Sequence, residues 1–344
     1  MLRRDQRLAI YMEGAVKDRS GKMGYGVLRY SPNPITCVVD SNMAGQDLAI
    51  LTGIPTNVPI VATVEEAVAL GSDVFVLGIA PSGGLIPQSW YPVIDTAVRS
   101  GLCIVNGLHD LLGPRYDQLQ PGQWIWDIRL EPPGIGPGTG EAAKLTNRRV
   151  LFIGTDMAVG KMTAGLELQK ALIARQVRTG FVATGQIGMT ITGGGVPLDA
   201  IRIDFASGAI QREILARADD DVVIIEGQGA LIHPGSSANL PLLRGSMPTH
   251  FVLCHRAGQK ELTILEHIRI PPLGDYIRLY EELASARGAF ETPVTVGVAL
   301  NTSHIADDDE AKRACEELAK ELGLPCTDPV RHGMDAIAQV LAAV

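Results

Sequence analysis

The sequence has little of what would indicate a disulfide-rich, membrane-spanning or nucleic-acid-binding protein. Its five cysteines are scattered without a CxxC pair, which predicts neither a disulfide framework nor a zinc site. No apolar run approaches about 18 residues, so we expect no transmembrane helix, and the charged start MLRRDQRLAI does not have the pattern of a signal peptide. The formal net charge of −8 argues against nucleic acid or a membrane surface as a partner. These absences favour a cytoplasmic enzyme with a small-molecule substrate.

Two further absences concern cofactors. The dinucleotide-binding pattern GxGxxG is missing, because Gly21, Gly24 and Gly26 form GxxGxG instead, and no NAD site is predicted. No pair of histidines has a nearby acidic residue at metal-ligand spacing, so we predict no dedicated metal site.

The length and the order of segments predict two α/β domains. A chain of 344 residues is long for one domain. Short apolar runs alternate with helical segments, one of which has Thr63 and Glu66 at capping-box spacing, and this alternation predicts two doubly wound, mostly parallel sheets. The Pro/Gly-rich segment 131–146 has no apolar periodicity. We therefore predict a Rossmann-like domain over 1–130, a linker over 131–146 and a P-loop NTPase-like domain over 147–344.

The segment 151–163, LFIGTDMAVGKMT, has the order of a phosphate-binding loop. A strand-like run comes first, Gly154 opens a turn, Gly160 and Lys161 close it, and helical periodicity follows. In this context backbone N–H groups and a helix N-terminus converge on an anion, and the lysine adds a positive charge. The predicted cofactor-binding residues of this loop are Gly154, Thr155, Asp156, Met157, Ala158, Val159, Gly160, Lys161, Met162 and Thr163.

The loop departs from the standard pattern GxxxxGK[ST] at two positions. Thr155 stands where the first glycine is expected, and Met162 replaces the Ser/Thr whose hydroxyl normally holds Mg²⁺. Thr163 comes one residue later and points in another direction on the helix. The form GTDxxVGK resembles the loop of the dethiobiotin synthetase branch of P-loop proteins, where the hydroxyl residue directly follows the lysine. Phosphate binding is therefore predicted more strongly than Mg²⁺ chemistry.

Polar residues follow other strand-like runs of the C-terminal half. Glu226 comes at the end of a run beside the P-loop strand, where a general base or a metal ligand would lie. His255, Arg256 and Lys260 follow a later run and are candidates for binding an anionic substrate, because strand exits face the ligand crevice of a doubly wound sheet. The alternative for each is a solvated surface charge. Asn301 ends a further run, and an asparagine at the matching place in the dethiobiotin synthetase branch reads a purine base.

The motifs KMGYGVLRY, GIAPSGG, GTDMAVGKMT, TGQIG and EGQGAL together resemble the DgcN-type D-glutamate N-acetyltransferase-like family over nearly the whole chain. The N-terminal half is also similar in pattern to the CoA-binding Rossmann domain of succinyl-CoA ligase α subunits. The family resemblance implies an acyltransferase that moves an acetyl group from acetyl-CoA to the amine of a D-amino acid, with D-glutamate as the expected acceptor. For this reaction Glu226 is the first choice as base, Lys161 or the loop backbone as oxyanion donor, and Arg256 and Lys260 as cations for a dicarboxylate.

Two other functions stay open. An ATP-dependent ligase or kinase of the dethiobiotin synthetase type would use Lys161 and Thr163 for the phosphates and Asp156 and Glu226 for Mg²⁺, and it would need Mg²⁺ for turnover. A non-catalytic nucleotide- or CoA-binding module would bind its ligand without turnover. In each case we expect a homodimer, because symmetric dimers are the commonest soluble oligomers.

Overall fold

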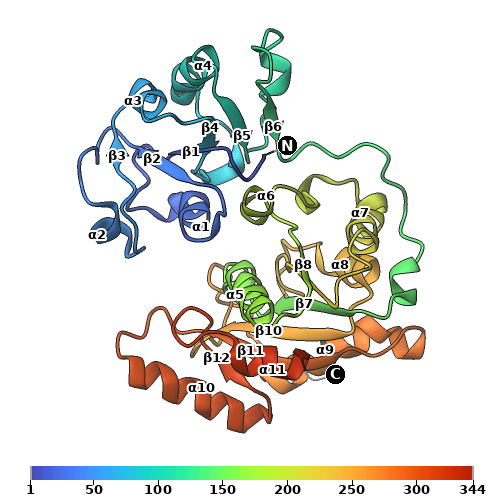
Figure 1. The fold of residues 1–344 in the computed structure, drawn as a ribbon. Coiled ribbons are helices and arrows are strands. Elements are labelled where there is room, and N and C mark those ends of the chain that lie inside the picture. The colour runs from blue at the N-terminus through green and yellow to red at the C-terminus, as the bar shows by residue number, and fades with distance from the viewer. Residues whose placement is uncertain (1, 343–344) are drawn as a thin grey trace. The chain divides into compact units, whose positions relative to one another are not determined.

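The computed structural model describes residues 2–342 and divides into two compact units, each built on a six-stranded parallel sheet (Figure 1). Unit 1 comprises Met1–Glu131 together with Gln186–Ala200, and unit 2 comprises Pro132–Gly185 together with Ile201–Val344. The predicted class, two doubly wound parallel α/β sheets, is confirmed. Within residues 2–342 no helix is both long and apolar enough to cross a membrane.

The sheet of unit 1 has the strand order β3-β2-β1-β4-β5-β6, and every strand pair is parallel. This is the order of the Rossmann fold. At the start of α3, Thr63 accepts a hydrogen bond from the Glu66 amide at 3.2 Å, as the capping-box spacing predicts. The elements are β1 (Leu8–Tyr11), α1 (Lys22–Tyr30), β2 (Ile35–Val39), α2 (Leu48–Thr52), β3 (Ile60–Val61), α3 (Val64–Ala69), β4 (Val74–Leu77), α4 (Tyr91–Arg99), β5 (Cys103–Asn106) and β6 (Ile125–Asp127).

The sheet of unit 2 has the order β12-β11-β10-β7-β9-β8, again with parallel pairs throughout. The strand that leads into the P-loop, β7, lies between β10 and β9, so the carboxyl ends of three central strands meet at one edge of the sheet. The elements are β7 (Arg148–Gly154), α5 (Lys161–Ala174), β8 (Thr179–Val182), α7 (Ile203–Leu215), β9 (Val222–Ile225), α8 (Asn239–Ser246), β10 (His250–Arg256), α9 (Leu273–Ser285), β11 (Val294–Asn301), α10 (Asp308–Leu322), β12 (Cys326–Thr327) and α11 (Asp335–Ala342).

One segment belongs to a different unit from the one expected. The predicted P-loop domain, 147–344, includes residues 186–200, but these form part of unit 1, where the helix α6 (Gln186–Thr192) packs against α1. The buried residues of α6 include Met189 and Ile191. The chain therefore leaves unit 2 after Gly185 and returns to it at Ile201.

Aromatic side chains from α9 pack on the sheet of unit 2. Tyr276 and Tyr280 are fully buried and meet edge to face, with ring centroids 5.3 Å apart, and Tyr280 also meets Phe251 of β10 at 5.9 Å. Both hydroxyls find acceptors, as buried tyrosines require. Tyr276 donates to the Gly154 carbonyl at 3.0 Å, and Tyr280 donates to the Asn239 side chain at 2.7 Å. The core thus reaches directly to the last residue of the P-loop strand.

Gly227 allows the end of β9 to approach β7, and this requirement gives the first prediction. A Cβ atom at Gly227 would lie 1.7 Å from the Phe152 carbonyl oxygen, which is backbone and cannot rotate away. We expect Gly227→Ala to lower the free energy of unfolding by about 3 kcal/mol or more, measured by urea denaturation. Gly136→Ala is the matched control, since a Cβ there meets nothing within 4 Å. Equal stability of the two variants would contradict this close approach.

Candidate functional site

The P-loop connects Gly154, at the end of β7, to Lys161, at the start of α5. Gly160 adopts a φ of 104°, which only glycine tolerates readily. Ala158 has a φ of 55°, an uncommon conformation for a residue with a side chain. The loop is therefore held in a strained shape, and such strain persists only where surrounding contacts enforce it.

Lys161 is buried inside this loop, with 7% of its surface exposed. Its Nζ donates to the Asp156 carbonyl at 2.9 Å, and its side chain runs past Gly154 and Gly227, where any Cβ would crowd it. Burial lowers the pKa of Lys161, while nearby acidic groups, including Asp156 and Glu226, oppose the shift. The lysine is thus positioned by the loop and by two glycines that leave room for it.

Asp156 is the best-connected side chain of the loop. Its Oδ2 accepts from the Thr263 amide and hydroxyl, both at 2.8 Å, and from the Gln259 side-chain amide at 2.7 Å, while Oδ1 accepts from the Met157 amide at 2.6 Å. Burial alone would raise the pKa of Asp156, but these hydrogen bonds outweigh it and hold the pKa below its ordinary value. The carboxylate joins the P-loop to the segment 257–272, which follows β10.

Three further contacts hold the loop from the neighbouring strands and from α9. The Thr155 hydroxyl lies 2.9 Å from His255 Nδ1, and the Asn301 side-chain amide donates to the Val159 carbonyl at 3.4 Å. The third is the Tyr276 hydroxyl on the Gly154 carbonyl, described above. These contacts come from β10, β11 and α9, so the loop is supported along its length.

The structure brings most of the predicted residues to this edge of the sheet, but they differ in burial and in hydrogen-bond partners. His255 is buried, and burial lowers its pKa to about 4, so its ring is uncharged at neutral pH and contacts the loop. The ring supports Thr155 in this arrangement, and its predicted role in substrate binding stays a prediction. Asn301 is half-buried beside the loop. Arg256 is half-buried and Lys260 exposed, and neither side chain has a hydrogen-bond or ion-pair partner within residues 2–342.

Glu226 follows β9 directly and is buried, with 5% of its surface exposed. Its Oε2 accepts from the backbone amides of Thr184 at 2.9 Å and Gly185 at 3.3 Å. Burial raises the pKa of Glu226 to about 7, although the two amides and the Lys161 charge favour the ionised form. A carboxyl group that titrates near neutral pH is suited to accept and release a proton.

The donors around the loop fit Mg²⁺ poorly. Mg²⁺ prefers oxygen ligands in octahedral geometry, but Met162 offers a thioether where a hydroxyl usually stands. The Asp156 carboxylate already accepts four hydrogen bonds. No group of three or more His, Cys, Asp or Glu side chains that could hold a metal occurs in the described part of the chain.

The residues that support the loop from outside it are not among the predicted site residues. Gln259, Thr263 and Tyr276 lie more than 100 positions from the loop residues they bind. No motif or spacing marks them, because ordinary Gln, Thr and Tyr residues in a connecting segment or on a helix carry no local signal.

Two parallel sheets, one in Rossmann order and one carrying a P-loop, define a two-domain α/β protein of the P-loop class. The chain belongs to the DUF1611 family. The family's C-terminal model, "Domain of unknown function (DUF1611_C) P-loop domain", matches residues 136–338, and its N-terminal model, a Rossmann-like domain, matches residues 41–131.

Relatives and a solved structure agree with this family. A D-glutamate N-acetyltransferase from a Pseudoalteromonas species is 37% identical over 278 residues, which cover 79% of this chain and 82% of that protein. One from Tritonibacter scottomollicae is 35% identical over 287 residues, covering 82% and 85%. A crystal structure of a DUF1611 family protein from Anabaena variabilis matches with a TM-score of 0.93 at 48% identity, covering 98% of this chain and 99% of that one.

The Asp156 contacts generate the second prediction. Asp156→Asn replaces one acceptor oxygen by an amide that would face the donors Thr263 and Gln259. We expect the free energy of unfolding at pH 7 to fall by about 2 kcal/mol, measured by urea denaturation, and the segment 257–272 to become more sensitive to limited proteolysis. Because the folded-state pKa of Asp156 is lowered, this contribution is present above pH 4 and is lost as pH falls below that value.

The control for this variant is Asp219→Asn, which changes an exposed aspartate that accepts no hydrogen bond in the described structure. A similar loss of stability in both variants would show that charge, and not the hydrogen bonds of Asp156, is responsible.

Proposed function

We propose that this protein is an N-acetyltransferase that moves the acetyl group of acetyl-CoA to the amine of a D-amino acid, with D-glutamate as the first acceptor to test. Two relatives that carry the name D-glutamate N-acetyltransferase support the proposal at 35–37% identity over about four fifths of the chain. The observation that carries it is the buried Glu226, whose pKa of about 7 suits a general base beside a phosphate-binding loop.

The donor substrate matches the chemistry of the loop. CoA carries a pyrophosphate and a 3′-phosphate, which backbone N–H groups, the N-terminus of α5 and Lys161 can bind without a metal ion. This explains why Met162 is tolerated where a Mg²⁺-binding hydroxyl usually stands. CoA also contains an adenine base, for which Asn301, at the end of β11 beside the loop, remains the candidate contact.

The acceptor amine must lose a proton before it attacks. In the proposed step Glu226 takes one proton from the substrate ammonium, and the amine nitrogen bonds to the thioester carbon. The carbon–sulfur bond then breaks and CoA leaves as its thiolate. The second proton that the nitrogen loses as the amide forms protonates this thiolate, and Glu226 returns its own proton to solvent. Lys161 or the loop amides would stabilise the negative charge that develops on the thioester oxygen. The unpartnered cations Arg256 and Lys260 are suited to the carboxylates of D-glutamate.

The transfer is proposed to be direct, without an acetyl-enzyme. Cys254 lies on β10 near Lys161, but it is fully buried, and burial raises its pKa to about 12. Its thiol therefore stays protonated at neutral pH, and a protonated thiol is a poor nucleophile.

The third prediction tests the base. We expect Glu226→Gln to lower kcat/KM for D-glutamate acetylation about a hundredfold or more. In the wild type kcat/KM should rise as pH increases through about 7, because the ionised carboxylate is the active form, and this step should be absent in the variant. Steady-state assays that follow CoA release at several pH values measure both effects.

Stability provides an independent readout for the same variant. The folded protein holds a proton on Glu226 up to about pH 7, whereas an unfolded Glu releases it near pH 4.5. The free energy of unfolding therefore falls as pH rises through this window, and Glu226→Gln should remove that contribution. Glu321→Gln, an exposed site on α10, is the control for both measurements. Unchanged acetyl transfer by Glu226→Gln would refute the assignment of the base.

The fourth prediction concerns metal dependence. We expect EDTA to leave acetyl transfer unchanged and CoA to raise the thermal midpoint without Mg²⁺, since binding to the native state alone stabilises it. An ATP-dependent ligase or kinase would behave differently, because its turnover and its thermal shift with ATP would both require Mg²⁺. That result would replace the acetyltransferase by the ligase or kinase. A shift with CoA but no turnover of any amine would indicate a binding module.

The homodimer remains part of this proposal, on the general ground that twofold symmetric dimers are the commonest soluble oligomers.

A further inference from the structure

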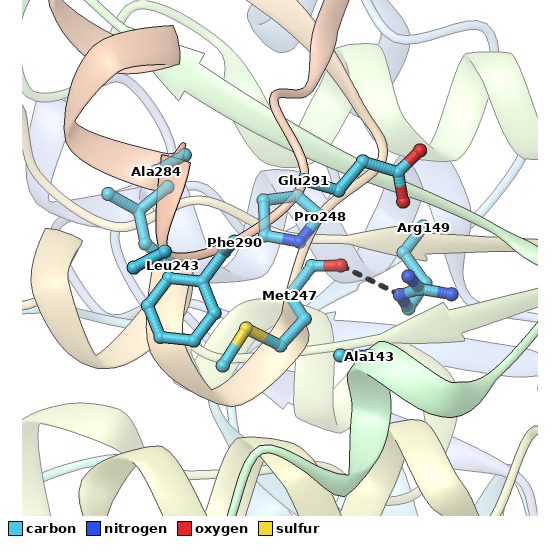
Figure 2. Close-up of a pocket in the computed structure, with 9 residues that line it drawn as sticks. Ala143, Arg149, Leu243, Met247, Pro248, Ala284, Phe290 and Glu291 are labelled. Carbon is cyan, nitrogen blue, oxygen red and sulfur yellow. Dashed lines mark hydrogen bonds between the residues drawn. The ribbon is translucent and has the colours of Figure 1, made fainter. Parts of the chain in front are cut away.

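A pocket near the amino end of β7, called the second pocket to distinguish it from the P-loop site, is drawn in Figure 2. Arg149, near the start of β7, lines it, whereas the P-loop begins at Gly154, at the other end of the same strand. Five residues of extended strand separate the two positions by roughly 17 Å. The lining residues are Ala143, Arg149, Leu243, Met247, Pro248, Ala284, Ala289, Phe290 and Glu291.

Arg149 is a buried cation without an anion. Only 2% of its surface is exposed, and its Nε donates to the Met247 carbonyl at 2.8 Å. One terminal nitrogen, Nη1, donates to the carbonyls of Leu145 and Asn147 and to the Asn147 side chain, at 2.9–3.2 Å. No carboxylate lies within ion-pair distance, and Nη2 has no hydrogen-bond partner, among residues 2–342. A buried charge is stabilised by a counter-ion. An anion bound in the pocket would supply one for Arg149.

Glu291 supplies the opposite charge at the same pocket. Its side chain is exposed and has no hydrogen bond or ion pair within the described chain. Glu291 lies beyond ion-pair distance of Arg149. Its negative charge nevertheless raises the pKa of Arg149, whereas burial lowers that pKa. Figure 2 shows the two charged groups on the same side of the pocket. A ligand with both a carboxylate and an ammonium group would therefore satisfy both residues.

The other side of the pocket is apolar. The side chains of Leu243, Met247 and Phe290 lie there in Figure 2, although the Met247 carbonyl bonds Arg149. The Phe290 ring is held by Arg244, whose guanidinium lies 4.9 Å from the ring centroid and donates to the carbonyls of Leu283 and Ala284. This surface can cover an aliphatic or aromatic side chain, and thioether and aromatic groups pack well against either.

We propose that this pocket binds a free α-amino acid with an apolar side chain. Arg149 holds the carboxylate, Glu291 holds the ammonium group, and the apolar side chain lies against Leu243, Met247 and Phe290. A simple carboxylic acid would leave Glu291 without a partner and close to a second negative charge. An amine would leave Arg149 without its anion. The site is separate from the P-loop and does not depend on the acetyl-transfer proposal.

The fifth prediction tests this site on the full chain by titration calorimetry. The probes are L-leucine, 4-methylpentanoate, which lacks its ammonium group, and isoamylamine, which lacks its carboxylate. We expect L-leucine to bind, and each of the other two to bind at least about tenfold more weakly, the loss expected for one charge-assisted hydrogen bond. D-Leucine is included to establish which configuration the pocket prefers.

Variants connect the binding to this pocket. Glu291→Gln changes an exposed residue and should weaken L-leucine binding about tenfold. It should not weaken binding of 4-methylpentanoate, because it removes a negative charge near that carboxylate. Phe290→Ala should weaken both ligands, because it removes apolar contact surface. Glu282→Gln, an exposed position on α9 that does not line the pocket, is the matched control and should bind like the wild type. Arg149 is left unchanged because four hydrogen bonds tie it to the fold.

Three outcomes would overturn the proposal. The first is no binding of L-leucine up to its solubility limit. The second is binding of 4-methylpentanoate as tight as that of L-leucine, which would make the pocket a site for simple carboxylates. The third is L-leucine binding that Glu291→Gln and Phe290→Ala leave unchanged, which would place the amino acid elsewhere on the protein.

Discussion

Four hydrogen bonds converge on the carboxylate of Asp156, and the geometry of the P-loop edge depends on them. A buried carboxylate is costly unless its oxygens are occupied, so the segment that supplies Thr263 and Gln259 must stay against the loop. Lys260 lies in the same segment, and Arg256 ends β10 immediately before it. The Asp156 side chain therefore holds the segment that carries one of the proposed acceptor cations against the proposed donor loop.

Burial also determines which groups near the loop can carry charge. Lys161 and Glu226 are both buried and act on each other electrostatically. Burial lowers the pKa of Lys161 and raises that of Glu226, so it favours the neutral form of each side chain. His255 is affected in the same way and is uncharged at neutral pH. Arg256 and Lys260 are less buried and supply positive charge at this edge, whereas Glu226 is left able to exchange a proton near neutrality. This distribution suits proton transfer from an amine better than binding of Mg²⁺.

The strand β7 has a functional candidate at each end. Its carboxyl end leads into the P-loop, where parallel α/β sheets generally bind ligands, and its amino end carries Arg149 in the second pocket. The topology of a parallel sheet does not by itself predict a ligand site at the amino ends of its strands. The second pocket is a candidate for a different reason. Its buried arginine is surrounded by carbonyl groups and has no anionic partner among the described residues.

The amino-acid sequence by itself determined the features that depend on neighbours along the chain. These include the P-loop up to Lys161, the cap at Thr63, and the alternation of strands and helices that leads to two parallel sheets. Only the tertiary structure decided that residues 186–200 join unit 1, that Asp156 is bound by Thr263 and Gln259, and that His255 is neutral. The physical reason is the range of the interactions. Turns, caps and periodicity act over a few residues, whereas burial and these hydrogen bonds join positions about 100 residues apart, which no local pattern encodes.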